Sequence, residues 1–402
     1  MNWQNLKESV EKELHSNILP YWMDHIQDQS GGLYGEISNE NTILPEAPKG
    51  LVMISRFLWT YAEAYRTSGR KEYLQFAGEI KDYLLSALSD RENGGFYWLI
   101  DSNDLPLDNK KVLYGHAFAL YGLSTYQMIA PSEENEKLCL EIFSLMEKHG
   151  RDWEKDGYIE ACNRDWSYGG ANNLGADDQA CDKSMNTNLH LLEAYTRYYF
   201  QSRRDDVKEA LISLISVITE KIYNSVTGHQ KLYFSMDWTP SGDIESYGHD
   251  VETSWLIWEA LEILEDEDLK TKYRETVLKL LDVSSSKATA PDGSLYNEQQ
   301  EGHLDKVRIW WVQAEYAVSL MNGYEMTGKD EYREKLKKLW DYIIDNQSDK
   351  TNGEWFWGIN DDGSILNREK GGMWKTLYHN GRACIELIHR IDKQIRRMED
   401  NV

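Results

Sequence analysis

The sequence predicts an all-α fold, an (α/α)6 barrel in which six inner helices are surrounded by six outer ones. Three observations predict it: a glycine-aromatic turn recurs six times, helical periodicity fills the chain between the turns, and strongly apolar segments alternate with amphipathic ones. A period of this length marks one supersecondary unit that is repeated and stacked on its neighbours. We therefore expect the 402 residues to form one closed domain, residues 1–402.

The turns set the length of the repeat. In each of them a glycine is followed within five residues by Phe, Tyr or Trp. The intervals between successive turn glycines are 63, 63, 71, 65 and 60 residues, for Gly31, Gly94, Gly157, Gly228, Gly293 and Gly353. Only short extended pieces beside the turns, such as residues 94–99, have the character of strands.

Between the turns, apolar residues recur every three or four positions, as in Leu51, Ile54 and Leu58, which is the period of an α-helix. The even-numbered segments are the more apolar, and the odd-numbered ones carry a charged face. A helix that is apolar nearly all round is buried, and an amphipathic helix covers it. Twelve helices are expected, over residues 3–27, 47–67, 72–89, 111–128, 134–149, 183–201, 205–222, 250–265, 268–283, 307–327, 331–346 and 374–396.

Six pairs of this kind make an inner ring inside an outer ring. An open superhelical solenoid is the competing arrangement, but six units is the number that closes. Each glycine-aromatic turn lies between an outer helix and the next inner helix, so the turns gather at the end where the inner helices begin. A pocket is expected to open there. The serine-rich residues 284–287 are expected to form a loop inside a repeat.

Composition excludes several classes of partner. The chain carries 44 Lys and Arg against 68 Asp and Glu, a net charge of −24, which repels nucleic acid and anionic membrane surfaces. We find no apolar run that could span a bilayer and no signal-peptide core at the amino terminus. The four cysteines lie far apart, as in a reducing cytosol. We expect a cytoplasmic protein, a monomer or weak homodimer, with a neutral ligand.

Polar residues occur near the amino-terminal ends of the otherwise apolar inner segments, where burial without partners would cost several kcal/mol. A solvated pocket relieves that cost. Each residue also has a structural alternative: Arg56 could pair with Glu252 or Glu315, and His116, His229 and His303 are expected to be purely structural. The candidates are Arg56, Asn186, His190, His249, Glu252, Trp310, Trp311, Glu315, Trp374 and His379.

This set of side chains suits proton transfer on a sugar. Imidazoles move protons near neutral pH, and a helix amino terminus keeps a neighbouring imidazole neutral and ready to act as a base. Arg56 can stabilise a developing oxyanion, and tryptophan faces bind sugar rings. The chemistry indicated is proton abstraction beside the carbonyl of a neutral carbohydrate, through an enediolate. No cofactor is expected, because dinucleotide and phosphate-loop motifs are absent, and no metal, because His249-x-x-Glu252 is a weak signal.

The motifs resemble those of the N-acylglucosamine 2-epimerase superfamily, and most of all those of its branch that acts on cellobiose. They are SRFLW at 55–59, MNTNLH at 185–190, GHDVETSWL at 248–256, WWVQAE at 310–315 and GGMWK with YHN at 371–380. The resemblance implies an (α/α)6 barrel. It also implies reversible epimerisation at C2 of the reducing-end sugar of β-1,4-linked glucose disaccharides, through ring opening and a cis-enediolate.

The resemblance also implies roles for single residues. His249 and His379 serve opposite faces of C2, and Glu252 orients and tunes His249. The remaining roles are Arg56, Asn186 and His190 at the C1 and C2 oxygens, Trp311 and Glu315 at the sugars, Trp374 stacked on the second ring, and Trp310 and Tyr114 as further binding residues.

Two positions depart from the family pattern: Asn188 replaces another polar residue or His, and Leu377 replaces a common Pro, which bears on substrate preference. Three alternatives stay open. The first is a 2-epimerase of free mannose and glucose, or a mannose isomerase. The second is a glycoside hydrolase that uses Glu252 and Glu315 as its two carboxyl groups. The third is a noncatalytic sugar-binding protein.

Overall fold

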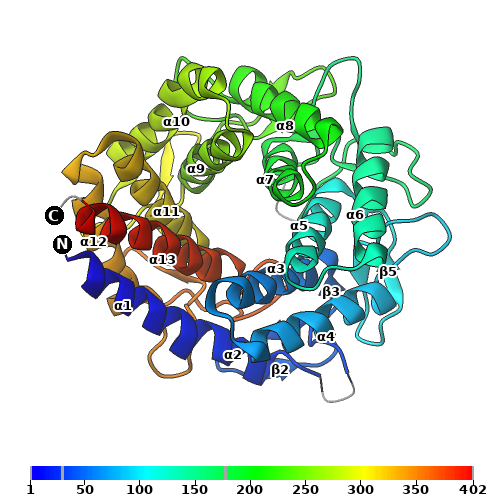
Figure 1. Ribbon diagram of the computed structural model, residues 1–402, viewed down its shortest axis with the longest axis horizontal. Coiled ribbons are helices and arrows are strands. Elements are labelled where there is room, and N and C mark those ends of the chain that lie inside the picture. The colour runs from blue at the N-terminus through cyan, green and yellow to red at the C-terminus, as the bar shows by residue number, and fades with distance from the viewer. Residues whose placement is uncertain (1, 29–30, 176–178, 401–402) are drawn as a thin grey trace.

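The computed structural model describes residues 2–28, 31–175 and 179–400. In this part of the chain an inner ring of helices lies within an outer ring (Figure 1), as the sequence predicts for an (α/α)6 barrel. The inner helices are α3 (Leu51–Ser68), α5 (Leu113–Ile129), α7 (Met185–Ser202), α9 (Tyr247–Leu264), α11 (Trp310–Thr327) and α13 (Tyr378–Glu399).

The outer ring is built from amphipathic helices, four of which contain a π-helical turn. They are α1 (Trp3–Glu13), which continues through η1 (Leu14–Ile18) into α2 (Leu19–His25), α4 (Lys71–Ala87), α6 (Glu133–Leu145) with η2 (Met146–Gly150), α8 (Asp205–Val217) with η3 (Ile218–Ile222), α10 (Glu267–Ala288), and α12 (Asp330–Tyr342) with η4 (Ile343–Gln347).

The ring closes on itself. Each inner helix contacts the next, α13 contacts α3, and the outer helix α1 packs against α13, so the two ends of the chain meet. The open solenoid is therefore excluded.

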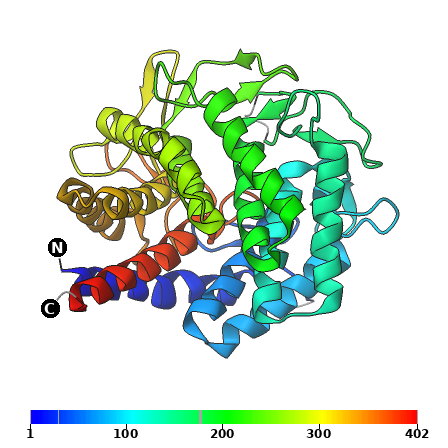
Figure 2. The same cartoon turned by 45° about the horizontal axis from the view of Figure 1, so that its top comes forward.

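Short antiparallel strands join neighbouring repeats at the end where the inner helices begin (Figure 2). In five repeats the strand directly before an inner helix pairs with a strand that follows the next glycine-aromatic turn. The strands are β1 (Glu36–Ile37) with β2 (Ile43–Leu44), β3 (Lys49–Gly50) with β4 (Leu99–Ile100) and β5 (Pro106–Asp108), β6 (Lys111–Val112) with β7 (Ala161–Cys162), β8 (Lys183–Ser184) with β9 (Tyr233–Phe234) and β10 (Pro240–Ser241), β11 (Ile244–Ser246) with β12 (Glu298–Gln300) and β13 (His303–Asp305), and β14 (Arg308–Ile309) with β15 (Gly358–Ile359).

Buried ion pairs hold these strands against the turns. All six turn glycines have φ between 73° and 99°, a left-handed conformation that glycine adopts without steric cost. Beside the second turn, the Lys111 ammonium lies 2.9 Å from Asp90, and both side chains are fully buried. Lys183 pairs with Asp152 and Lys370 with Asp349 in the same way, each at 2.6 Å. The turn thereby fixes where the next inner helix begins.

Two local predictions were wrong. Residues 284–287 are helical rather than a loop, because the Ser284 hydroxyl donates to Asp250 and the Ser285 hydroxyl bonds Tyr316, so α10 continues to Ala288. The last inner helix begins at Tyr378 rather than at residue 374. The segment before it is held by a buried salt bridge between Lys375 and Glu354 and does not enter the helix.

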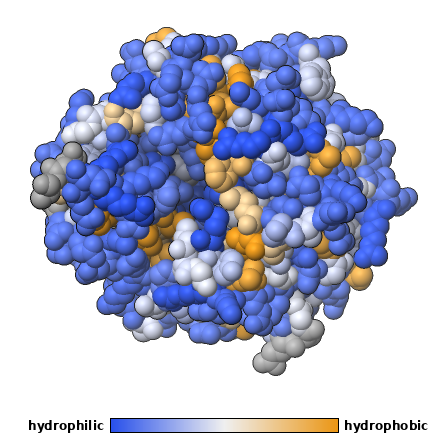
Figure 3. All heavy atoms as spheres, viewed as in Figure 1, coloured by the Kyte–Doolittle hydropathy of each residue, from blue (hydrophilic) through white to orange (hydrophobic). Residues whose placement is uncertain are grey.

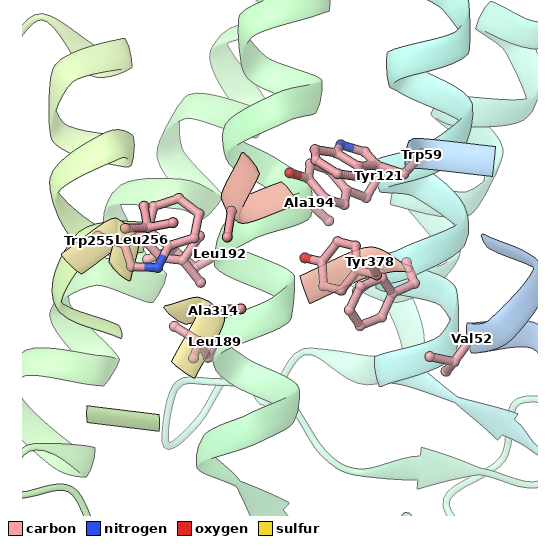
Figure 4. Packing of buried hydrophobic residues seen from close by; sticks show 14 of the residues in the cluster. Val52, Trp59, Tyr121, Leu189, Leu192, Ala194, Trp255, Leu256, Ala314 and Tyr378 are labelled. Atoms are coloured by element: carbon pink, nitrogen blue, oxygen red, sulfur yellow. The ribbon is translucent and has the colours of Figure 1, made fainter. Parts of the chain in front are cut away.

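Aromatic side chains fill the barrel interior. Figure 4 shows Trp59, Tyr121 and Tyr378, from α3, α5 and α13, gathered between the inner helices; the rings of Trp59 and Tyr121 stack with centroids 5.0 Å apart. The face seen in Figure 3 is predominantly hydrophilic, with apolar residues in separate areas. Among the described residues we find no helix long and apolar enough to cross a membrane.

The buried ion pairs predict a stability effect. Asp90→Ala leaves the Lys111 ammonium buried without its carboxylate, so the free energy of unfolding should fall by about 3–5 kcal/mol. Asp341→Ala is the matched control, because Asp341 pairs with Lys337 on the exposed face of α12 and should cost less than about 1 kcal/mol. Urea denaturation measures both. Equal losses would show that the buried pair does not hold the turn.

Candidate active site

The repeat places one residue of each of five inner helices at an equivalent position. In five inner helices the N-cap residue is also the last residue of a strand. The sixth residue after these caps (Gly50, Val112, Ser184, Ser246 and Ile309) is Arg56, Phe118, His190, Glu252 and Glu315. Four of these five positions carry candidate residues.

The fourth residue after the cap anchors the helix to its glycine-aromatic turn. The His116 ring accepts a hydrogen bond from the Phe96 backbone N–H at 3.0 Å, and Asn188 accepts one from Tyr158 at 2.9 Å. Asp250 and Gln313 do the same in the next two repeats. His116 and Asn188 therefore have structural roles.

A cavity of about 280 Å³ opens at this end of the barrel, a volume near the lower end for small-molecule sites. Ten of the eleven predicted residues line it; Glu315 lies behind His379. The sequence analysis missed three lining residues, Gly175, Trp357 and Arg368. The full lining is Arg56, Tyr114, Gly175, Asn186, His190, His249, Glu252, Trp310, Trp311, Trp357, Arg368, Trp374 and His379.

The two candidate proton carriers have different partners. His379 Nδ1 lies 2.6 Å from a Glu315 carboxylate oxygen and 3.9 Å from Glu252. His249 Nδ1 lies 2.7 Å from the Ser246 hydroxyl. The expectation that Glu252 orients His249 is thus not met among the described residues. Glu252 accepts a hydrogen bond from the Arg382 guanidinium, and the hydrogen-bond partner of His249 Nδ1 is the Ser246 hydroxyl.

Arg382 is the centre of a buried network that the sequence analysis missed. Its side chain is 1% exposed and donates to Glu252 at 2.6 Å and to Glu315 at 2.7 Å. It also bonds Glu193 and the Tyr378 hydroxyl. The other Glu193 oxygen lies 2.8 Å from His190 Nδ1, so one guanidinium is linked to both His190 and His379. The sequence did offer a signal for these two residues, because Glu193 and Arg382 each lie three positions after a candidate histidine and so share its helix face.

Arg56 has a different role from Arg382. Its guanidinium donates to the Trp374 carbonyl and the Tyr114 hydroxyl, both at 2.9 Å, and lies over the Phe118 ring. It does not form the pair with Glu252 or Glu315 that its sequence position allowed. In the described part of the chain, three buried atoms of the lining make no hydrogen bond: Arg56 Nε, Asn186 Oδ1 and Trp310 Nε1. A polyhydroxylated ligand could satisfy them.

Burial and the network shift the pKa values of the ionisable groups. Burial lowers the pKa of His249 to about 3, and burial together with Arg56 and Arg382 lowers that of His379. Burial and the neighbouring Glu315 raise the pKa of Glu252 to about 8, and burial raises that of Glu315. Burial opposes ionisation of Glu193 as well, but Arg382 and His190 lower its pKa to about 2. Burial and mutual repulsion therefore disfavour ionisation of both Glu252 and Glu315.

Glu252, Glu315 and His379 are also close enough to hold a metal ion, with one ligand atom from each within 4.8 Å of the others. Arg382 disfavours metal binding at this place, because its guanidinium already forms salt bridges with both carboxylates and would repel a cation.

Comparisons with known proteins agree on one family. The N-acylglucosamine 2-epimerase (GlcNAc 2-epimerase) family model matches residues 32–383. A cellobiose 2-epimerase of Bacteroides fragilis is 40% identical over 387 residues, which cover 95% of this chain and 98% of that protein. The structure of the cellobiose 2-epimerase from Spirochaeta thermophila matches with a TM-score of 0.93 at 38% identity, over 98% of both chains.

Proteins related to the alternatives are more distant. A D-mannose isomerase of Marinomonas mediterranea is 24% identical, over 90% of this chain and 92% of that protein. A GH76 α-mannanase of Bacteroides thetaiotaomicron matches with a TM-score of 0.65 at 10% identity, which shows a shared fold alone.

The opposite pKa shifts of Glu252 and Glu193 predict opposite effects of pH on stability. The raised pKa of Glu252 contributes stability that is present below pH 4.5 and is lost as the pH rises toward 8. The lowered pKa of Glu193 contributes stability that is present above pH 4.5 and is lost as the pH falls toward 2. Relative to wild type, Glu252→Gln should therefore gain Tm between pH 4.5 and 8.

Glu193→Gln is the matched control, with the same isosteric change in the same network. It should be less stable than wild type at pH 6 and lose that deficit as the pH falls below 4.5. Thermal unfolding of the three proteins across this pH range measures both effects. A parallel response of the two variants would contradict the charge assignment.

Proposed function

The chain belongs to the N-acylglucosamine 2-epimerase family, and from that premise we propose that it is a carbohydrate 2-epimerase of the cellobiose type. It interconverts glucose and mannose at the reducing end of β-1,4-linked disaccharides. Identity of 36–40% to cellobiose 2-epimerases over nearly the whole chain supports this substrate class. The reaction is an isomerisation, so substrate and product have the same atoms.

One observation carries the proposal: two histidines from different inner helices stand beside the same tryptophan in one cavity. The ring of Trp311 lies 4.8 Å from that of His249 and 5.7 Å from that of His379. Their Nδ1 atoms are occupied by Ser246 and Glu315, which leaves both Nε2 atoms for the substrate. Two proton carriers in one pocket suit removal and return of a proton at a single carbon.

The reaction then proceeds in three steps. The sugar ring opens and exposes the C1 aldehyde, which makes the C2 proton acidic. One histidine removes that proton, and Arg56, Asn186 and His190 hold the two oxygens of the cis-enediolate, whose negative charge Arg56 stabilises. The other histidine gives a proton to the opposite face of C2, and the ring closes on the epimer. Arg56 Nε and Asn186 Oδ1, both without partners in the described chain, suit this role.

The second sugar ring lies at the tryptophan-rich side of the cavity. Trp374 stacks on this ring, and Trp357 and Arg368 extend the same wall, with the guanidinium 4.0 Å from the Trp357 ring centroid. Trp310 packs on Trp357 with centroids 4.5 Å apart and supports the wall from behind. An aromatic face binds an apolar face of a sugar ring, which favours a disaccharide over a single sugar.

The alternatives are less well supported. Action on free mannose, whether as epimerase or isomerase, rests on relatives near 24% identity. A hydrolase would need two carboxyl groups about 5–9 Å apart on either side of the bond to be cleaved. Glu252 and Glu315 instead both accept from Arg382 Nη2, and both are buried, which disfavours this role.

We also propose that the enzyme works in the cytoplasm, as one catalytic domain and as a monomer or weak homodimer. Its four cysteines are all buried and lie far apart in the sequence, without a Cys-x-x-Cys pair, as in a reducing compartment.

Proton NMR of the purified enzyme with cellobiose in D2O, without added metal or cofactor, tests the proposal. We expect a mannose-type reducing end with deuterium at C2, while the remaining cellobiose keeps its C2 proton at early times. His249→Asn and His379→Asn should each lower kcat about 10²–10⁴-fold, since each removes one proton carrier. His303→Asn, at an exposed position in β13, is the control and should not change kcat.

Free glucose as the product would identify a hydrolase, and conversion of mannose without conversion of cellobiose would move the assignment to single sugars. Wild-type turnover in either histidine variant would refute the role given to that residue.

A further inference from the structure

Two serines at equivalent positions of the repeat use their hydroxyl groups differently. Ser184 and Ser246 are the N-cap residues of α7 and α9. The Ser184 hydroxyl accepts a hydrogen bond from the backbone N–H of Thr187, three residues later, at 3.0 Å, which is the ordinary N-cap contact. The Ser246 hydroxyl makes no such cap bond. It bonds the side chain of the residue three positions later, His249.

The partners of the two histidines differ in charge. A serine hydroxyl is neutral, so it positions the ring of His249 while stabilising a positive charge on it much less than a carboxylate would. Glu315, at 2.6 Å from His379, can share a proton with that ring. Glu252, at 3.9 Å, adds a second carboxyl group on the same side. The other groups that act on His249 are the Trp311 ring at 4.8 Å and, at longer range, His190 and Glu315.

We propose that Ser246 is a positioning residue that holds His249 as a neutral base with its proton on Nδ1. In the direction in which His249 is the base, the two histidines then begin in different states: His249 carries no acidic proton, and the His379–Glu315 pair carries one; the reverse direction begins from the opposite distribution of that proton. This inference rests on the proposed function and extends it to a residue that the family motifs quoted above do not include.

The proton balance follows from this difference. When His249 removes the C2 proton it becomes an imidazolium, with Nδ1–H still donated to Ser246. The His379–Glu315 pair gives its proton to the other face of C2 and is left one proton short. The net charge of the protein is therefore unchanged at the end of the reaction, but His249 has gained one proton and the His379–Glu315 pair has lost one. Water restores the first state after release of product, and the neutral Ser246 favours this because it stabilises the imidazolium less than a carboxylate would.

Three serine variants test the proposal. Ser246→Ala removes the only group that fixes the His249 tautomer in the described chain, so kcat for cellobiose should fall about tenfold with KM little changed. Ser246→Thr keeps a hydroxyl group and should restore kcat. Ser184→Ala is the matched control: it also loses one hydrogen bond of an N-cap serine and should lower Tm by about 1–2 °C, but kcat should stay at the wild-type value.

A spectroscopic measurement tests the same claim without turnover. In protein labelled with ¹⁵N-histidine, the His249 signals, identified by their loss in His249→Asn, should show a protonated Nδ1 and an unprotonated Nε2. Ser246→Ala should shift them toward protonated Nε2.

Wild-type kcat in Ser246→Ala, or a protonated Nε2 in the wild-type enzyme, would overturn the proposal. Equal losses of kcat in Ser246→Ala and Ser184→Ala would show a structural role only and would also overturn it. If the wild-type enzyme does not epimerise cellobiose, the proposed function fails. The ¹⁵N signals still report on the His249 tautomer in that case, so the two failures are distinguishable.

Discussion

The site depends on one buried guanidinium. Arg382, on α13, is hydrogen-bonded to carboxyl groups from α7, α9 and α11, so it connects four of the inner helices described here at the level of the pocket. Three carboxyl groups around one cation cannot all ionise cheaply in a buried site, and the pKa values of the two nearest His379, Glu252 and Glu315, are raised. Burial raises the pKa of both Glu252 and Glu315, while Arg382 opposes that rise, so the network that joins the four helices also sets the ionisation of the carboxyl groups beside His379.

The repeat explains how such a network can be assembled. Five of the inner helices begin at a strand, four of these five are anchored to a glycine-aromatic turn by the fourth residue after the cap, and the sixth residue after the cap recurs at equivalent positions in all five. The anchors are neutral in three repeats, where His116, Asn188 and Gln313 serve, and acidic in the fourth, where Asp250 also binds His229 at 2.6 Å. The backbone plan is shared, and the side chains at equivalent positions have diverged into structural and chemical roles.

The helices and most of the pocket could be predicted from the sequence, because they depend on the spacing of apolar residues and on polar residues among them. The hydrogen-bond partners of the buried side chains could not be predicted. Twelve helical segments and the pocket end followed from apolar spacing, and six lining residues followed from polar side chains on apolar helices, whereas Tyr114 came only from the family resemblance. The partner of His249 did not follow, because helical spacing brings both Glu252 and Ser246 within reach, and only the position of Arg382 settles which is used. Arg368 lies between β15 and α13 without periodicity, so no pattern could identify it, whereas Trp357 lies in the sixth glycine-aromatic turn, where the repeat offered a signal that was not used.

The most direct test of this account is kcat of Arg382→Lys for cellobiose, measured beside far-UV circular dichroism. A lysine keeps the positive charge but cannot reach Glu193, Glu252 and Glu315 together. We expect an intact helical spectrum and a loss of kcat of about 10–100-fold, as when other residues that orient catalytic groups are changed. A folded Arg382→Lys enzyme with wild-type kcat would contradict the claim that this network sets the state of the two histidines.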